Sequence, residues 1–171
     1  MQYKRNRNPD FWKSNRRDCN CGSFALNVTS WFTPYAKEDD EEYSDAERMS
    51  TILAMYEENC SLEEIYDAIL AFDTEAILKS CPWLERVKLA DTKEGDRVIA
   101  YRLFINWDDL EWGEVDDDFH FRVRLNGFWF EKCGEEPIRF CGTAADEELW
   151  EIATYLVYDS EVIYFRVKDG M

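Results

Sequence analysis

The spacing of apolar residues divides the chain into a helical first half and a strand-rich second half. In CGSFALNVTSWF, residues 21–32, apolar side chains recur at helical spacing, and Pro34 is expected to end this helix. The pattern S-D-A-E at 44–47 is typical of a capping box and predicts that a second helix begins there. A second box, S-L-E-E at 61–64, predicts a third helix that ends at Pro82.

The second half has the period of two that is typical of strands. HFRVRL at 120–125 alternates strictly, and the Asn126-Gly127 pair that follows is a strong hairpin signal. Helices followed by antiparallel strands predict the α+β class. The predicted elements of this half are a strand at 97–105, paired strands at 120–125 and 127–132, a short helix at 146–156 and a last strand at 161–167.

Length and composition predict one domain with an acidic helical part. The 171 residues are 46% hydrophobic, which is enough apolar material for one core. Residues 38–75 carry fourteen Asp and Glu against one Arg, and residues 108–118 carry seven acids and no base. We therefore expect a single domain over 1–171, in which an acidic helical lobe at 38–82 is inserted between the first helix and the sheet.

The net charge of −17 limits the partners that the chain can attract. It predicts repulsion from nucleic acid and from anionic membranes, and attraction to strongly basic surfaces. No apolar run reaches the roughly 20 residues that span a bilayer, and the first residues lack the apolar stretch of a signal peptide. We expect a cytoplasmic protein with six cysteine thiols, whose acidic face does not bind nucleic acid directly and which does not bind a membrane.

The two acidic runs are the candidate partner-binding surface. Carboxylates at this density can imitate phosphates, and Tyr35, Tyr43, Trp107 and Trp112 add planar rings; a plain solvated face is the alternative interpretation. An EF-hand is excluded because the second run lacks the ligand register and the central glycine. The candidate residues are Glu38, Asp39, Asp40, Glu41, Glu42, Asp108, Asp109, Asp116, Asp117 and Asp118.

Cys21 and His120, the only histidine, are a candidate catalytic pair. The amino end of a helix stabilises a thiolate at Cys21, whereas the acidic surroundings oppose it. A buried thiol and a surface histidine are the alternative. A further alternative is a zinc site formed by Cys19, Cys21, Cys133, Cys141 and His120. Its C-x-C and C-x7-C spacings, however, differ from the C-x2-C spacing of the usual zinc knuckles. We therefore expect no metal and no cofactor.

Several short features occur in the order found in one known family of folds. They are Asn20-Cys21 before Phe24-Ala25-Leu26, Gly95-Asp96 before Val98-Ile99-Ala100, and Asp118-Phe119-His120-Phe121 before Gly127-Phe128-Trp129. In these positions the chain resembles the papain-like, NlpC-type cysteine hydrolases, in a form found in phage and Firmicutes proteins.

The resemblance implies a papain-like scaffold with Cys21 as nucleophile and His120 as base. The third catalytic member in such proteins is often a histidine before a lysine, and here Glu131 precedes Lys132. A glutamate can still orient His120, or it can mark a catalytic set that has decayed.

Three functions follow from these patterns. The leading hypothesis is a phage-type acidic inhibitor of a host nucleic-acid-dependent defence nuclease, of the anti-CRISPR or DNA-mimic type, which binds a basic nucleic-acid channel. The alternative is a cysteine hydrolase, a peptidase or amidase, that uses Cys21, His120 and Glu131. A third is an assembly protein that associates through aromatic patches.

Overall fold

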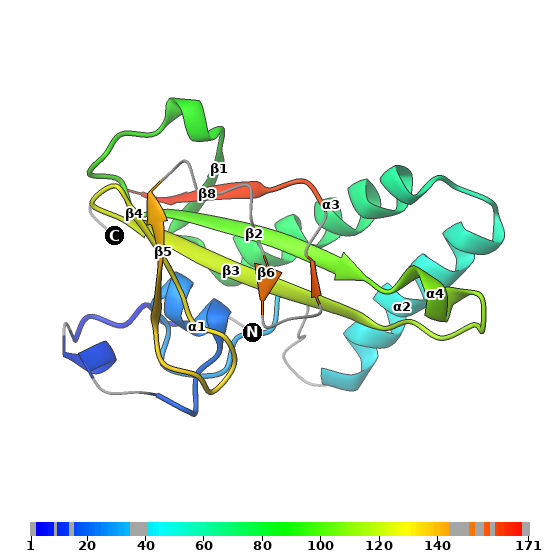
Figure 1. The fold of residues 1–171 in the computed structure, drawn as a ribbon, viewed down its shortest axis with the longest axis horizontal. Coiled ribbons are helices and arrows are strands. Elements are labelled where there is room, and N and C mark those ends of the chain that lie inside the picture. Colours follow the sequence, from blue (N-terminus) through cyan, green and yellow to red (C-terminus); the bar gives the residue numbers. More distant parts are fainter. Residues whose placement is uncertain are drawn as a thin grey trace.

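The fold is a six-stranded antiparallel sheet with helices against it (Figure 1). The computed structural model describes residues 3–8, 10–13, 16–34, 41–143, 151–152, 156–157 and 160–168, without the side chains of 41–45, 151–152 and 156–157. The helices are α1 (Cys21–Leu26), α2 (Glu41–Glu57), α3 (Leu62–Ser80) and α4 (Trp107–Leu110), with short 3-10 turns at Phe11–Lys13 and Leu89–Asp91. The strands are β1 (Leu84–Val87), β2 (Val98–Ile105), β3 (Asp117–Leu125), β4 (Phe128–Glu131), β5 (Arg139–Thr143), β6 (Glu151–Ile152), β7 (Leu156–Val157) and β8 (Ile163–Val167).

The sheet has the strand order β1-β8-β2-β3-β4-β5, and β6 and β7 form a separate pair. Its two faces carry different clusters. On one face Tyr101 and Phe121 belong to the main core, which also contains buried residues of α1 and α3. On the other face Val98, Ala100 and Trp129 form a smaller cluster. Because side chains alternate along a strand, His120 and Phe121 point to opposite faces.

The helix α2 and the start of α3 lie at one end of the long strands β2 and β3, next to α4, and α3 then runs behind the sheet (Figure 1). A buried ion pair joins them to the sheet: Arg48 of α2 donates through Nε to Asp73 of α3 at 3.2 Å. Asp73 also accepts from the Tyr101 hydroxyl at 2.5 Å, and Arg48 reaches Asp117 of β3. The expected helical lobe is therefore fastened to the sheet by charged groups as well as by apolar packing.

Several predicted elements are confirmed. The box at 61–64 caps α3, since Glu64 N donates to Ser61 Oγ at 3.3 Å and Ser61 N donates to Glu64 at 2.8 Å. The β3–β4 hairpin turns at Asn126 and Gly127, whose φ angles of 51° and 82° suit a type I′ turn. The α+β class is confirmed as well, through the antiparallel sheet and the helices that precede it.

The predictions for three helices need correction. The first helix ends at Leu26, well before Pro34, because Asn27 is left-handed at φ 58° and its N–H bonds back to Phe24. The second begins at Glu41 rather than at the predicted box. In the predicted helix at 146–156, residues 151–152 belong to β6 and Leu156 to β7, because cross-strand pairing replaces helical bonding there; the rest of that segment lies outside the described residues.

Candidate functional site

Cys21 is the first residue of α1, and local hydrogen bonds fix its position. The Asn20 side chain accepts from Ser23 N at 3.0 Å, and Asn20 N donates to Ser23 Oγ at 3.2 Å, so the helix begins with a complete capping box. The Cys21 Sγ lies 3.9 Å from the carbonyl oxygen of Phe119. The helix therefore places the thiol against the β3 backbone immediately before His120.

The environment of Cys21 does not favour a thiolate. The residue is 5% exposed. Burial raises the pKa of the Cys21 thiol to about 12, and Asp118 adds to this, while a backbone hydrogen bond from Phe121 opposes it. The thiol is therefore protonated at neutral pH, contrary to what a low-pKa nucleophile requires.

His120 and Glu131 are brought together by the hairpin register. Arg122 of β3 is directly opposite Glu131 of β4, and His120 lies two residues before Arg122 on the same face. His120 Nε2 is 3.0 Å from Glu131 Oε2. Because a carboxylate only accepts, we assign the Nε2–H tautomer. Burial lowers the pKa of His120 although Glu131 opposes this, so the imidazole is neutral.

Two arginines also hold the Glu131 carboxylate. Arg122 Nε donates to Oε2 at 2.8 Å, and Arg139 Nε donates to Oε1 at 2.8 Å. Burial opposes ionisation, but the hydrogen bond from His120 and the charge and hydrogen bond of Arg122 hold the pKa of Glu131 well below its usual range. Glu131 is therefore an ionised carboxylate that accepts a hydrogen bond from His120 and fixes the orientation of its ring.

The thiol of Cys133 lies beside this pair. One ligand atom each of His120, Glu131 and Cys133 lies within 4.8 Å of the other two. Cys133 is half-buried, and its pKa is raised to about 11, first by burial and then by Glu131. From the sequence, Cys133 was not placed beside Glu131 and was a candidate only in a zinc site with Cys19, Cys21, Cys141 and His120. The signal for that placement is position, since Cys133 follows Glu131 by two residues and so extends along the same face.

The structure separates the predicted acidic residues into three groups. Glu38, Asp39 and Asp40 lie outside the described residues, and Glu41 and Glu42 lie in α2 with their side chains undescribed. Four others lie on or near the surface around α4 and the start of β3: Asp108, Asp109, Asp116 and Asp118.

Asp117 has a different environment from its neighbours. Its side chain is 4% exposed and pairs with the buried Arg48. It is therefore part of the contact between helix and sheet. Alternation along β3 turns Asp117 inward, whereas Asp116 and Asp118 on either side are exposed.

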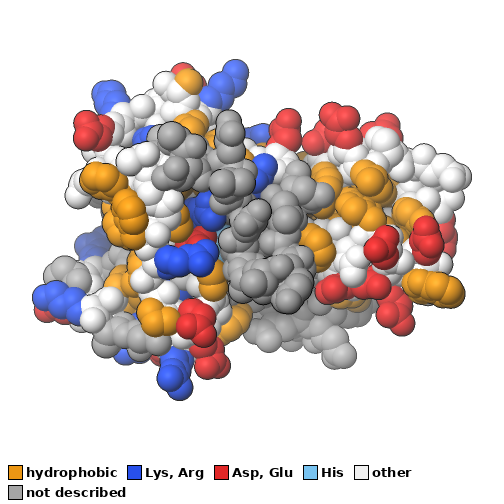
Figure 2. Space-filling model, viewed as in Figure 1, with side chains coloured by type: hydrophobic (Ala, Val, Ile, Leu, Met, Phe, Trp, Pro, Cys, Tyr) orange, Lys and Arg blue, Asp and Glu red, His pale blue; other side chains and the backbone are white. Residues whose placement is uncertain are grey.

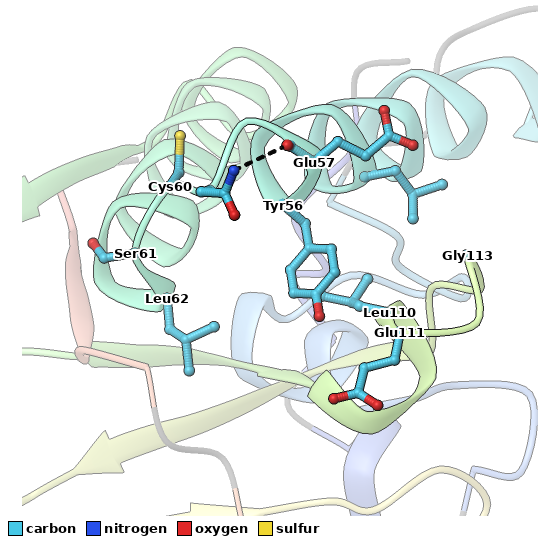
Figure 3. A pocket seen from close by; sticks show the side chains of 10 residues that line it. Tyr56, Glu57, Cys60, Ser61, Leu62, Leu110, Glu111 and Gly113 are labelled. Carbon is cyan, nitrogen blue, oxygen red and sulfur yellow. Dashed lines mark hydrogen bonds between the residues drawn. The ribbon is translucent and has the colours of Figure 1, made fainter.

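Two acidic residues, Glu57 and Glu111, line a hollow between the α2–α3 turn and α4. The hollow has a volume of about 620 Å³, and apolar side chains line it beside Glu57 and Glu111. Figure 3 shows Tyr56 pointing toward Leu110 and Glu111 across this space. Next to it Trp112 is 83% exposed. We call this surface the acidic end, and its exposed members are Glu57, Glu58, Asp108, Glu111, Trp112, Glu114 and Asp116.

Basic side chains are rare near the acidic end. Residues 106–118 contain no Lys or Arg, and the only one within 41–78 is the buried Arg48. In the view of Figure 2, acidic and apolar side chains gather over this end, whereas Lys and Arg lie over the rest of the molecule. The acidic end therefore has a negative field and an exposed aromatic side chain, Trp112.

Comparison of the chain with protein-family models, curated proteins and solved structures gives no match. Across the described parts of the chain, none of the helices combines the length and the apolar character needed to cross a membrane. The function is therefore argued from the two sites themselves.

Proposed function

We propose that this protein is an acidic inhibitor that docks its acidic end into a basic, nucleic-acid-binding channel of another protein. The observation that carries the proposal is the pairing of exposed Trp112 with carboxylates that have no Lys or Arg among residues 106–118. The target class is a nucleic-acid-dependent defence nuclease in the cytoplasm of a host cell, and the scaffold is of the papain-like type.

The chemistry of the acidic end supports docking on such a surface. Exposed carboxylates can meet the lysines and arginines that otherwise bind phosphates, which speeds association and sets specificity. An exposed tryptophan is the side chain most often found at the energetic centre of an interface. The hollow beside Trp112 gives a partner side chain a place to insert, with Leu62, 46% exposed, at its edge.

The proposal is tested with a panel of purified RNA-guided and DNA-binding nucleases. We expect cleavage by at least one to be inhibited at low salt, with inhibition weakening steeply as salt rises. The triple variant Asp108→Asn, Glu111→Gln, Asp116→Asn should lose this inhibition.

A matched control carries the same change of charge elsewhere. Glu94, Glu135 and Glu136 are exposed and lie outside the acidic end. Their replacement by Gln should leave inhibition within about threefold of wild type, since distant charges are screened beyond roughly 10 Å. Equal loss in both triple variants, or no inhibition of any nuclease, would overturn the proposal.

A cysteine hydrolase is the second candidate, and one observation favours it. Cys21 begins a helix against β3, and Glu131 holds the His120 imidazole at 3.0 Å. Cys21 packs with Phe121 on one face of the sheet, however, while His120 points to the other face, so the structure does not bring the two groups together. In this candidate Cys21 attacks a carbonyl carbon, His120 takes the thiol proton, and amides near Cys21 hold the oxyanion.

The reaction needs an opening that uncovers Cys21, because the residue is 5% exposed and its pKa is raised to about 12, mainly by burial. The pH dependence of Cys21 alkylation, read at that site by mass spectrometry, separates the two candidates. A midpoint far below that of an ordinary thiol, about 8.5, that rises in His120→Ala would support the hydrolase. A midpoint above it in both proteins would exclude it.

A further inference from the structure

The cluster on the face of the sheet that carries His120 has the composition of a metal site. His120, Glu131 and Cys133 offer an imidazole nitrogen, a carboxylate oxygen and a sulfur, all within 4.8 Å of one another. These are the three ligand types that Zn²⁺ accepts in proteins. Two of them come from paired strands and the third from two residues beyond β4, so the hairpin register sets their spacing.

We propose that His120, Glu131 and Cys133 bind a single Zn²⁺ ion. This site lies outside the acidic end and is independent of the function proposed above. It uses Cys133 in place of Cys21, and it makes His120 a ligand in place of a base.

The distances suit the ion. Zinc bonds of about 2.0–2.2 Å to nitrogen and oxygen place these two atoms about 3.4 Å apart at a tetrahedral angle. His120 Nε2 and Glu131 Oε2 are 3.0 Å apart, so this separation opens by only a few tenths of an ångström. The sulfur needs about 3.6 Å to the nitrogen, which a turn of the half-buried Cys133 side chain can supply from within 4.8 Å.

Cys141 is the thiol that would complete the coordination. It lies on β5 and packs beside Val98, Ala100 and Trp129, on the face of the sheet that carries His120. Binding Zn²⁺ through two thiolates releases one proton from Cys133 and one from Cys141. The His120 proton moves from Nε2 to Nδ1 and is retained. Zn²⁺ brings two positive charges and two protons leave, so the net charge of the buried cluster does not change.

The arginines keep the carboxylate in place during this exchange. Arg139 holds Oε1 of Glu131 and leaves Oε2 to Arg122 and His120. Replacing the hydrogen bond from His120 by a metal bond therefore removes one of the contacts of Oε2 and none of those of Oε1. Arg139 is itself 54% exposed, which gives the ion a route from solvent past a side chain that can move.

The test uses the full-length protein with Co²⁺ as a spectroscopic probe and Zn²⁺ as competitor. We expect one equivalent of Co²⁺ to give a thiolate-to-metal charge-transfer band and tetrahedral d–d bands, which Zn²⁺ abolishes. Zn²⁺ binding should release about two protons in weakly buffered solution. It should also raise the unfolding temperature, since the ion binds the folded state.

Two single variants make the test specific. Cys133→Ser should prevent binding at one equivalent of Co²⁺, so that the charge-transfer band of both thiolates and the thermal shift are lost. Cys60→Ser, at a half-buried thiol beside the acidic end, should leave both unchanged. Cys133 lies in a loop, and serine preserves its shape, so the variant is expected to fold; its circular dichroism confirms this. Cys141→Ser should weaken binding at least tenfold and release about one proton.

Three results would overturn the proposal. They are the absence of a charge-transfer band with stoichiometric Co²⁺, a band that survives Cys133→Ser, and a band that Cys60→Ser removes. Co²⁺ held only by exposed carboxylates gives octahedral spectra without the thiolate band and counts as the first of these.

Discussion

The acidic end and the cluster around Glu131 use carboxylates in opposite ways. At the acidic end exposed acids have few basic groups near them, and the only basic residue within 41–78 is the buried Arg48. Around Glu131 one buried carboxylate has Arg122, Arg139 and His120 as partners. The first arrangement leaves charge available to a partner molecule, and the second uses charge to order groups inside the protein.

The comparison teaches where each kind of function can reside. Burying a carboxylate without partners lowers the free energy of unfolding by several kcal/mol. A carboxylate in the interior therefore needs cationic partners beside it. An exposed carboxylate carries almost no such penalty, so its neighbours can be left acidic without loss of the fold. The charge of −17 therefore reflects the surface, while the described ion pairs of the interior are satisfied.

The largest effect is expected from Glu131→Gln. The variant removes the carboxylate that pairs with Arg122, which is 5% exposed. We expect a loss of about 3–5 kcal/mol in the free energy of unfolding, because a buried ion pair is broken. Urea denaturation followed by tryptophan fluorescence measures it. A loss under about 1 kcal/mol would contradict the account of Glu131 as the centre of the buried cluster.

Neighbouring aspartates on β3 should differ in the same assay. Asp117→Asn removes a partner of the buried Arg48 and should cost about 1–3 kcal/mol, since Arg48 retains Asp73. Asp116→Asn, the matched control one residue earlier, should stay within about 0.5 kcal/mol because Asp116 is exposed. Equal losses in the free energy of unfolding for the two variants would contradict the buried position of the Asp117 side chain.

The pH dependence of stability should separate the two regions. The pKa of Glu131 is lowered on folding, so its contribution is present above about pH 4.3, the unfolded value, and declines as pH falls toward the folded pKa. The pKa of His120 is also lowered, by burial, so stability declines as pH falls below about 6.5. Repulsion among the surface acids has the opposite sign, because protonation relieves it.

Salt distinguishes these contributions. In about 1 M NaCl the Debye length falls to about 3 Å, which screens the surface repulsion but not the buried cluster. We therefore expect the free energy of unfolding in high salt to fall steadily from pH 7 to pH 4. A rise over this range would assign the pH dependence to the surface acids.

The smallest effect on stability is expected from the acidic end itself. The triple variant Asp108→Asn, Glu111→Gln, Asp116→Asn removes three like charges from one surface. Its unfolding midpoint in urea should equal or slightly exceed that of wild type, because mutual repulsion is reduced. A clear decrease would show that these carboxylates stabilise the fold.

The sequence predicts local features of this fold well. The Asn126-Gly127 turn and the Ser61 cap depend on residues close together in the chain, and both are confirmed. The end of α1 was not predicted, because a left-handed Asn27 competes with a continuing helical pattern and only its contacts decide. The edge strands β1 and β5 were also missed, since their partners are distant or irregular: β5 pairs through a register shift at Trp129.

The candidate site was predicted only in part. His120 and Glu131 were expected to interact, and they do at 3.0 Å. The arginine partners of Glu131 and the position of Cys133 depend on strand register. Register decides which residues share a face of the sheet, and the spacing of residues along the chain does not reveal it. The alternation of HFRVRL did contain a signal, because it places His120 and Arg122 on one face.

The measurement that tests the central claim most directly is displacement of labelled DNA from the channel of a nuclease that the protein inhibits, followed by fluorescence anisotropy at low salt. We predict that wild type displaces the DNA. The triple variant at Asp108, Glu111 and Asp116 should need at least tenfold more protein, and the control variant at Glu94, Glu135 and Glu136 should behave as wild type. Displacement by all three proteins at equal concentration, or by none, would contradict the assignment of the acidic end as the binding surface.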